Sequence, residues 1–329
     1  MPSGPKPSPA AEVSIHVDTV PHAVFGAVAT VSLTGQRHSS SEDFIAIETT
    51  EDRTVFAVFD GHGGGGVSGM ARTLLPPLAL EKLRASGDTA KDALGESFLE
   101  TDAAIHRTQQ FSEGGVGSTA TLVFVPHQGD QLLVGSLGDS PALLVSLLPH
   151  GGLRHERLSV SHNPSSDKEQ RRINAAIDEA ISASNDFSEK QRLNSMRPRP
   201  VGGIVRVGGT LAVSRALGDF AYKWDVTSTR NAVTAKPTVK TVPMPTSSHE
   251  RAAFLVLCSD GVTDELDDAL VADAVISETQ GVRSGQISLE QGLRAAAHRI
   301  VRDAVDTAAR KPNRERDDIT LIIVPLLYG

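Results

Sequence analysis

The stretch Val55-Phe56-Ala57-Val58-Phe59-Asp60-Gly61-His62-Gly63-Gly64 decides the fold of this chain. Its five apolar residues predict a strand that is buried on both faces. The strand ends abruptly in an acid, a glycine and a histidine, and glycines fill positions 63–66. A rigid element therefore holds a carboxylate and an imidazole at the edge of the core, and Gly61 lets the backbone approach closely enough for its carbonyl to act as a ligand. A lone Asp-Gly pair, taken by itself, is more typical of an acidic turn.

Further acids stand where other apolar runs begin or end. The run 254–258 repeats the opening pattern, because it too leads into an Asp-Gly pair. Each acid alone is typical of a solvated turn, but the strands of one sheet can bring their ends to the same edge. The acids in such positions are Glu42 and Asp43, Asp60, Asp139, Asp260 and Asp264, and Asp317 and Asp318.

Carboxylates gathered at one edge would repel and raise one another's pKa. Divalent cations resolve that conflict, and an all-oxygen ligand set suits magnesium or manganese rather than zinc. Two such ions about 4 Å apart can lower the pKa of a shared water and stabilise a phosphoryl transition state. His62 has two interpretations: as a ligand it favours zinc or iron, and beside the metals it would donate a proton to a leaving group. Arg37 is a candidate for bidentate contact with phosphate oxygens, although a surface arginine fits its spacing equally well.

Composition narrows the class of protein. The chain has 329 residues, of which 39% are hydrophobic and 22% charged, as is typical of a soluble globular protein. A net charge of -8 argues against nucleic acid as a partner. The single cysteine, Cys258, excludes an internal disulfide and a cysteine-based zinc cluster, and it is expected to be a small core residue.

The sequence also gives expectations for the setting of the protein. No apolar stretch is long enough to span a bilayer, so we expect no membrane partner. Because neither a signal peptide nor a transit peptide is visible, we expect an intracellular protein, cytoplasmic or nuclear, or one of the mitochondrial matrix if a presequence was removed. We also expect a monomer.

The remaining periodicity predicts one large domain, 21–329, after a loose tail, 1–20. Strands 117–125, 131–135 and 142–148 are expected to form an antiparallel meander, because their connections are short. Pro76-Pro77 should bend or interrupt the helix expected after the glycines. Another segment, near 174–205, is expected to be a flap-like insertion that is mobile over its polar part. The other expected helices are 89–109, 168–181 and 288–306.

Seven motifs, in this order and spacing, resemble those of the metal-dependent Ser/Thr protein phosphatases of the type 2C (PPM) family. The resemblance covers roughly residues 25–326. It implies an α+β fold, a four-layer α-β-β-α sandwich of two antiparallel sheets flanked by helices, with metals in a channel at one end. The motifs are Ser41-Glu42-Asp43, Asp60-Gly61-His62-Gly63-Gly64, Gly117-Ser118-Thr119-Ala120, Gly138-Asp139-Ser140, Leu211-Ala212-Val213-Ser214-Arg215-Ala216-Leu217-Gly218-Asp219, Ser259-Asp260-Gly261-Val262-Thr263-Asp264 and Arg316-Asp317-Asp318.

The resemblance implies two core magnesium or manganese ions and a third, weaker one. In the positions that match, Asp60 resembles the carboxylate that bridges the two core metals. The other implied contributors are Asp260 and Asp317 at the first metal, Glu42 and the carbonyl of Gly61 at the second, Asp43 on metal-bound water, and Asp139 and Asp264 at the third.

The implied reaction is the hydrolysis of phosphoserine or phosphothreonine in proteins by direct attack of metal-bound hydroxide, with no phosphoenzyme. His62 resembles the general acid that protonates the leaving oxygen, and Arg37 the phosphate-binding arginine. Arg37, however, lies one residue further from the Glu-Asp pair than is usual. Pro141 replaces a common arginine, and Asp318 stands where asparagine is common, but neither change removes a ligand.

Two other hypotheses remain open. A pseudophosphatase, which would use the same fold as a binding or regulatory module, is favoured by the shifted Arg37. Such a protein would be expected to lose acids at Asp60, Asp260 or Asp317, and all three are present. A different two-metal hydrolase, such as a nuclease, fits poorly with the negative net charge and with the lack of a basic aromatic groove.

Overall fold

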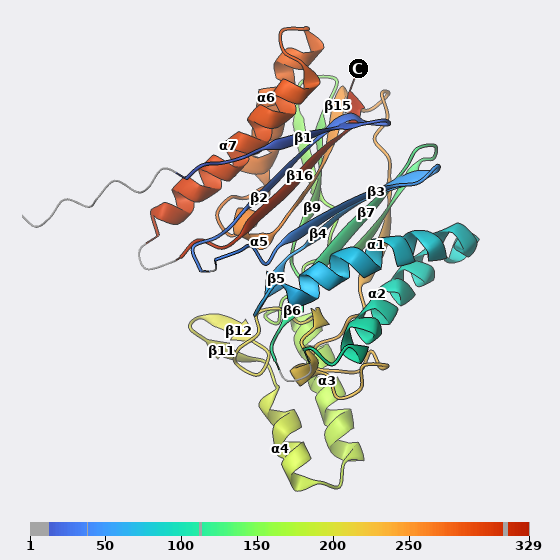
Figure 1. Ribbon diagram of the computed structural model, residues 1–329, viewed down its shortest axis with the longest axis vertical. Helices are drawn as coiled ribbons and strands as arrows, with labels where there is room; N and C mark the ends of the chain where they lie inside the picture. The colour runs from blue at the N-terminus through green and yellow to red at the C-terminus, as the bar shows by residue number, and fades with distance from the viewer. Residues whose placement is uncertain (1–12, 38, 112–113, 312–314, 329) are drawn as a thin grey trace, which may run out of the picture.

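Two antiparallel sheets lie face to face in the computed structural model, which describes residues 13–37, 39–111, 114–311 and 315–328. A pair of long helices covers the outer face of each sheet (Figure 1). The four-layer α-β-β-α sandwich expected from the sequence is therefore confirmed. A separate group of helices and a hairpin extends from one end of the sandwich (Figure 1).

The first sheet has the strand order β1-β2-β16-β15-β9-β10, and every neighbouring pair is antiparallel. Residues 254–258, the second apolar run that ends in Asp-Gly, belong to β15, one of the two central strands of this sheet. The six strands of the sheet are β1 (Asp18–His22), β2 (Gly26–Leu33), β9 (Ala142–Leu147), β10 (Leu153–Arg157), β15 (Ala252–Cys258) and β16 (Ile319–Tyr328).

The second sheet has the order β14-β8-β7-β4-β3 and is also antiparallel throughout. The expected meander is wrong in its third strand, because β9 crosses to the first sheet and pairs with β15. Gly138, with a φ of 93°, makes the turn where the chain crosses. The strands are β3 (Phe44–Thr49), β4 (Arg53–Phe59), β7 (Ala120–Pro126), β8 (Gln131–Leu137) and β14 (Thr238–Pro243).

Strands β4 and β15 are apolar on both faces because each lies between two cores. In β4, Phe56 and Val58 face the core between the sheets, whereas Val55, Ala57 and Phe59 face the helices of the second sheet. In β15 the same alternation divides the side chains between the inner core and the helices of the first sheet. Cys258 is fully buried on the helix side, as its apolar neighbours suggested.

Helices α1 (Gly66–Ser86) and α2 (Ala90–Arg107) cover the second sheet, and α6 (Asp268–Arg283) and α7 (Leu289–Ala309) cover the first. Helix α7 begins with a capping box, in which the Ser288 side chain accepts from the Gln291 backbone N–H and the Gln291 side chain accepts in return. The short helix α5 (Asp260–Thr263) follows β15 directly.

Two boundary predictions need correction. Helix α1 is not interrupted at Pro76-Pro77, since it continues to Ser86. Leu75 and Pro76 are buried against the second sheet's core, and this burial compensates for the two missing backbone donors. The predicted loose tail, 1–20, is too long, because β1 already begins at Asp18, while residues 1–12 lie outside the described part of the chain.

The insertion expected to be mobile is folded instead. It contains α3 (Asp167–Ala183), α4 (Phe187–Ser195) and a hairpin of β11 (Arg199–Val201) and β12 (Ile204–Arg206). We call residues 167–206 the flap. An apolar cluster that is separate from the three sandwich cores holds it together, and residues that follow the flap, between Val207 and Val233, complete this cluster. The polar sequence between 182 and 200 concealed this, because only two of its residues, Leu193 and Met196, join that cluster.

Short strands at the end of the sandwich bring distant motifs together. Strands β13 (Leu217–Gly218), β6 (Gly117–Ser118) and β5 (Gly61–His62) pair in that order. This small sheet lies where β4 ends, and the flap continues beyond it (Figure 1).

Candidate active site

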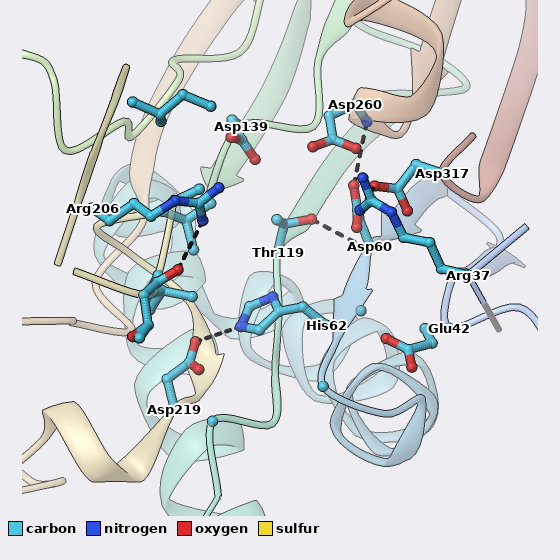
Figure 2. A pocket seen from close by; sticks show the side chains of 18 of the residues that line it. Arg37, Glu42, Asp60, His62, Thr119, Asp139, Arg206, Asp219, Asp260 and Asp317 are labelled. Carbon is cyan, nitrogen blue, oxygen red and sulfur yellow. Dashed lines mark hydrogen bonds and ion pairs between the residues drawn. The ribbon is translucent and has the colours of Figure 1, made fainter. Parts of the chain in front are cut away.

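A cavity of about 910 Å³ opens at the end of the sandwich where the acids were expected to meet. Acidic side chains from both large sheets line it, together with Gly61, His62 and Arg37 (Figure 2). The structure therefore brings together nearly all of the site residues predicted from the sequence. The acids of its lining are Glu42, Asp60, Asp139, Asp260, Asp264, Asp317 and Asp219.

The two strand–Asp-Gly motifs meet through Asp60. Its Oδ2 accepts hydrogen bonds from the backbone N–H of Asp260 at 3.3 Å and from the Ser140 hydroxyl at 3.4 Å. Its own backbone N–H donates to the Thr119 hydroxyl at 3.2 Å. Asp60 follows β4 of the second sheet and Asp260 follows β15 of the first, so one carboxylate joins the ends of both sheets.

Asp43 does not line the cavity, unlike the other predicted site residues. It is buried, and its Oδ2 has no hydrogen-bond partner among the described residues. Burial raises the pKa of the Asp43 carboxyl to about 7; the nearby hydroxyls of Ser259 and Thr320 oppose this rise, and the charges of Asp318 and Asp317 add to it. A buried oxygen without a partner is costly, so this position fits a polar group that the protein itself does not supply.

Burial also raises the pKa of Asp60 and of Asp260 far above the ordinary value, and neighbouring carboxylates raise both further. It raises the pKa of Asp139 to about 6, with Asp264 as the next contributor. Among the described residues, no three acidic, histidine or cysteine side chains are already arranged to hold one metal ion. The oxygen-only chemistry and the mutual repulsion nevertheless suit hard divalent cations, toward which the carboxylates would have to turn.

Arg37 reaches the cavity despite its shifted position in the sequence. One of its terminal nitrogens lies 2.6 Å from Asp317 Oδ2, and both side chains are partly exposed. Asp318, the departure from the usual asparagine, has a structural role that the sequence did not indicate. Its carboxylate accepts from the backbone N–H of Glu42 at 2.7 Å and of Gly35 at 2.5 Å, which fixes the segment carrying Glu42 and Arg37.

His62 pairs with Asp219, a residue that sequence reasoning did not select as a site residue. His62 Nε2 lies 2.8 Å from Asp219 Oδ2, and the Asp219 side chain is fully buried (Figure 2). Burial lowers the pKa of the imidazole, but the charge and hydrogen bond of Asp219 outweigh it, so the pKa of His62 is raised. This site therefore favours the protonated imidazole.

The backbone around this pair is shaped to hold it. Asp219 has a φ of 50°, in the left-handed region that non-glycine residues seldom adopt. At Gly117, any Cβ would clash with both Asp219 Oδ2 and His62 Nε2. Because one quoted motif ends at Asp219 and another begins at Gly117, the sequence did contain a signal for this pair, namely two short motifs with no assigned role.

A buried ion pair between Lys223 and Asp102 fixes the backbone directly before Asp219. Lys223 Nζ lies 2.7 Å from Asp102 Oδ2, and both side chains are almost fully buried. The other oxygen of Asp102 accepts from the Gly218 backbone N–H at 2.8 Å, directly before Asp219 in the chain. Helix α2, which carries Asp102, is thereby tied to the loop that positions Asp219.

Lys223→Met is expected to destabilise the fold by about 3–5 kcal/mol, because it leaves the buried Asp102 charge without its partner. Adding Asp102→Asn, which keeps an acceptor for Gly218, should recover a large part of that loss. Urea unfolding of both variants checks this. A double variant no more stable than Lys223→Met would contradict this explanation.

Comparisons with known proteins agree with this geometry. The family model described as protein phosphatase 2C matches residues 28–312. A probable protein phosphatase 2C of Caenorhabditis elegans is 31% identical over 279 residues, which cover 83% of this chain and 66% of the relative. The protein phosphatase 2C homolog 3 of Schizosaccharomyces pombe is 31% identical over 306 residues, 90% of this chain and 63% of the relative. The chain thus spans about two thirds of the length of these relatives.

Solved structures share the fold. A serine-threonine phosphatase 2C from Toxoplasma gondii superposes with a TM-score of 0.68 at 18% identity, over 96% of this chain and all of the other. A C. elegans sex-determining protein superposes with a TM-score of 0.69 at 24% identity, over 92% of this chain and 65% of the other. At these identities the likeness concerns the fold alone.

Proposed function

The chain belongs to the protein phosphatase 2C family, and from this premise we propose that it is a magnesium- or manganese-dependent protein serine/threonine phosphatase. The observation that supports the proposal most is the cavity itself. There, carboxylates that repel one another lie beside an arginine and a histidine whose protonated form is favoured. Such a set can neutralise a phosphoryl group and protonate its leaving oxygen.

Two core cations would be held by side chains from both sheets, and Asp139 with Asp264 would hold a third, weaker ion. Divalent cations bound there would supply an activated water for in-line attack and neutralise the phosphate charge. Asp43, whose buried Oδ2 has no hydrogen-bond partner among the described residues, would accept from water held near the second ion. The core set comprises Asp60, Asp260, Asp317, Glu42 and the carbonyl of Gly61.

The protein's own residues then handle the phosphate and the leaving group. Arg37 would turn from Asp317 to bind two phosphate oxygens. Because Nε2 of His62 is engaged with Asp219, the proton for the departing serine or threonine oxygen would come from Nδ1. Asp219 would keep the ring oriented by accepting a hydrogen bond from the Nε2–H, and that proton stays on the ring after Nδ1 has given up its own.

The proposal is tested by the hydrolysis of an aryl phosphate and of a phosphothreonine peptide with manganese, with magnesium and with a chelator. Turnover of both substrates that the chelator removes is the expected result. Peptide binding without turnover would instead indicate the pseudophosphatase, whose supporting observation is the contact of Arg37 with Asp317. Cleavage of phosphodiesters would indicate a nuclease.

The flap is expected to affect protein substrates more than small ones. Replacing residues 184–199 by a short Gly-Ser linker removes Leu193 and Met196 from the flap's cluster but leaves the three sandwich cores intact. We expect the ratio of activity on a phosphoprotein to activity on an aryl phosphate to fall about tenfold, the effect of losing one or two contacts. Thermal unfolding of the variant serves as the control, and an unchanged ratio would contradict the prediction.

We further propose that the protein acts as an intracellular monomer on phosphoproteins. Within its described residues, no helix is both long and apolar enough to cross a bilayer. A single, buried cysteine is typical of reducing compartments. One relative, from Xenopus laevis, is named as a mitochondrial protein phosphatase. Most of the exposed large apolar residues, among them Val20, Leu153 and Leu270, lie singly on different elements, as is usual in monomers, and Val201 and Ile204 form one pair on the flap hairpin.

A further inference from the structure

The β11–β12 hairpin of the flap presents two arginines side by side. Arg199 and Arg206 are directly opposite each other in the antiparallel register, so their side chains lie on the same face of the hairpin. Arg206 lines the cavity. Like charges in directly opposed positions destabilise a strand pair, so this arrangement is unfavourable unless something compensates for it.

The protein does not supply that compensation. In the described part of the chain, no carboxylate pairs with either guanidinium. Arg206 donates to the Thr210 carbonyl at 2.8 Å, and Arg199 donates to the Gly208 carbonyl at 2.7 Å. Three other flap arginines do have carboxylate partners: Arg172 pairs with Glu169, Arg192 with Glu189 and Arg197 with Asp178. In a chain of net charge -8, two neighbouring arginines without acidic partners are a specific local feature.

The guanidinium of Arg199 is also held in place. Gly208 and Gly209, with φ values of 60° and 81°, form a tight turn beneath it. Any Cβ on Gly209 would lie within 2.7 Å of the Nη2 of Arg199, so this turn gives the guanidinium room only because Gly209 has no side chain. The hydrogen bond to Gly208 and the close approach of Gly209 restrict this exposed side chain, which lowers the entropy that it loses on binding an anion.

Arg206 and Arg37 lie on different sides of the cavity. Figure 2 shows Arg37 beside Asp317 and Asp60, whereas Arg206 lies on the wall formed by the flap, beyond His62. Arg37 is therefore the cation placed for the phosphate undergoing hydrolysis. Arg206, with Arg199 beside it on the same hairpin face, would face a different part of a bound substrate, although Arg199 does not itself line the cavity.

We propose that Arg199 and Arg206 form a subsite for a second anionic group on the substrate, an acidic side chain or another phosphate in the same peptide. The inference rests on the proposed phosphatase function and specifies its substrate class. Val201 and Ile204 lie on the same hairpin face, are 44% and 48% exposed, and form the next cross-strand pair. They would contact an apolar side chain or the aliphatic stem beside the anionic group.

The test compares phosphothreonine peptides that differ only in their flanking residues. One has neutral flanks, a series carries a single glutamate at successive positions on either side, and a third kind carries a non-hydrolysable phosphoserine analogue there. We expect kcat/KM to be about tenfold higher for the best acidic peptide than for the neutral one, as for one charge-assisted hydrogen bond. High salt should reduce this ratio. The glutamate and phosphonate peptides show which anionic group the subsite prefers.

The variant Arg199→Gln/Arg206→Gln should bring the ratio of acidic to neutral peptide close to one. The matched control, Arg192→Gln/Arg230→Gln, removes the same charge from surface ion pairs with Glu189 and Glu179 and should keep the wild-type ratio. The proposal is overturned if the wild type shows no preference at any position, if the hairpin variant keeps it, or if the control loses it.

If the protein is not a phosphatase, the same experiment gives a result that is distinguishable from the loss of the subsite. In that case neither a peptide nor an aryl phosphate is hydrolysed with either metal. Fluorescence anisotropy of a labelled acidic phosphonate peptide still tests the subsite, because it measures binding without turnover. Weaker binding by the hairpin variant than by the control supports the subsite, and equal binding refutes it.

Discussion

Asp60→Asn is expected to abolish metal-dependent turnover and, in the metal-free protein, to raise the free energy of unfolding. Asp60 is half-buried in the wall of the cavity, and its carboxylate interacts with the charges of Asp260, Asp43 and Asp139. In the folded state, burial and repulsion from these neighbours both destabilise the ionised form of the Asp60 carboxyl. Asparagine has nearly the same shape and keeps an oxygen that can accept from Asp260 and Ser140, so the variant loses the charge but not the packing.

The same charges make the stability of the metal-free protein depend on pH in a definite direction. The carboxyl pKa values of Asp43 and Asp139 are about 7 and about 6 in the folded chain, against about 3.9 for an unfolded one. The folded state therefore binds more protons between these values, and stability falls as pH rises from about 4 to about 7. Asp60→Asn should flatten this fall, because it removes one of the interacting charges.

Thermal unfolding between about pH 5 and pH 7.5, with and without manganese, measures both effects. The wild type should gain stability from manganese, and the gain should be largest at the upper end of that range. Asp60→Asn should start higher without metal and gain little from it. Asp273→Asn, at an exposed ion pair on α6, is a control that should behave as the wild type does. A destabilised Asp60→Asn protein that still gains stability from manganese would contradict the assignment of Asp60.

Much of the fold could be predicted because apolar runs, and the acids that directly precede or follow them, are local features of the sequence. The run 55–59 and the run 254–258 each specified a doubly buried strand, and their shared Asp-Gly ending marked Asp60 and Asp260 as site residues. The expectation that strands of one sheet bring the acids together was wrong for this pair, because β4 and β15 belong to different sheets that end side by side. Local signals failed where the decisive contact was distant. Strand β9 left the expected meander because it pairs with β15, and no nearby residue determines that choice.

The candidate site shows the same contrast between local signals, which could be read from the sequence, and distant contacts, which could not. Its acids could be proposed from the sequence because each follows or precedes an apolar run. The pairing of His62 with Asp219 was not proposed, since the two residues are 157 apart and the motif that ends at Asp219 was given no role. The register that opposes Arg199 to Arg206 was likewise hidden, because the polar, proline-containing sequence around them is typical of a loop rather than of a hairpin.

His62→Ala is expected to slow hydrolysis of a phosphothreonine peptide about 10²–10⁴-fold, the usual contribution of a general acid. An alkoxide is a poor leaving group and depends on a proton, whereas an activated phenolate does not. The variant should therefore lose much less activity on aryl phosphates whose phenols are strongly acidic. The measurement is kcat/KM across aryl phosphates of graded leaving-group pKa, and the slope of log(kcat/KM) against that pKa should be steeper in the variant.

Asp219→Asn separates the orientation of His62 from its presence. Asparagine tolerates the left-handed φ of 50° at this position and can still contact Nε2, so the backbone should be retained. It removes the charge that raises the pKa of His62, and fewer molecules then carry the proton needed at Nδ1. We expect a smaller loss than in His62→Ala, with a steeper slope than in the wild type and little further loss when both changes are combined. Variants of His62 that slow good and poor leaving groups equally would show that the imidazole is not the proton donor, whatever its distance from Asp219.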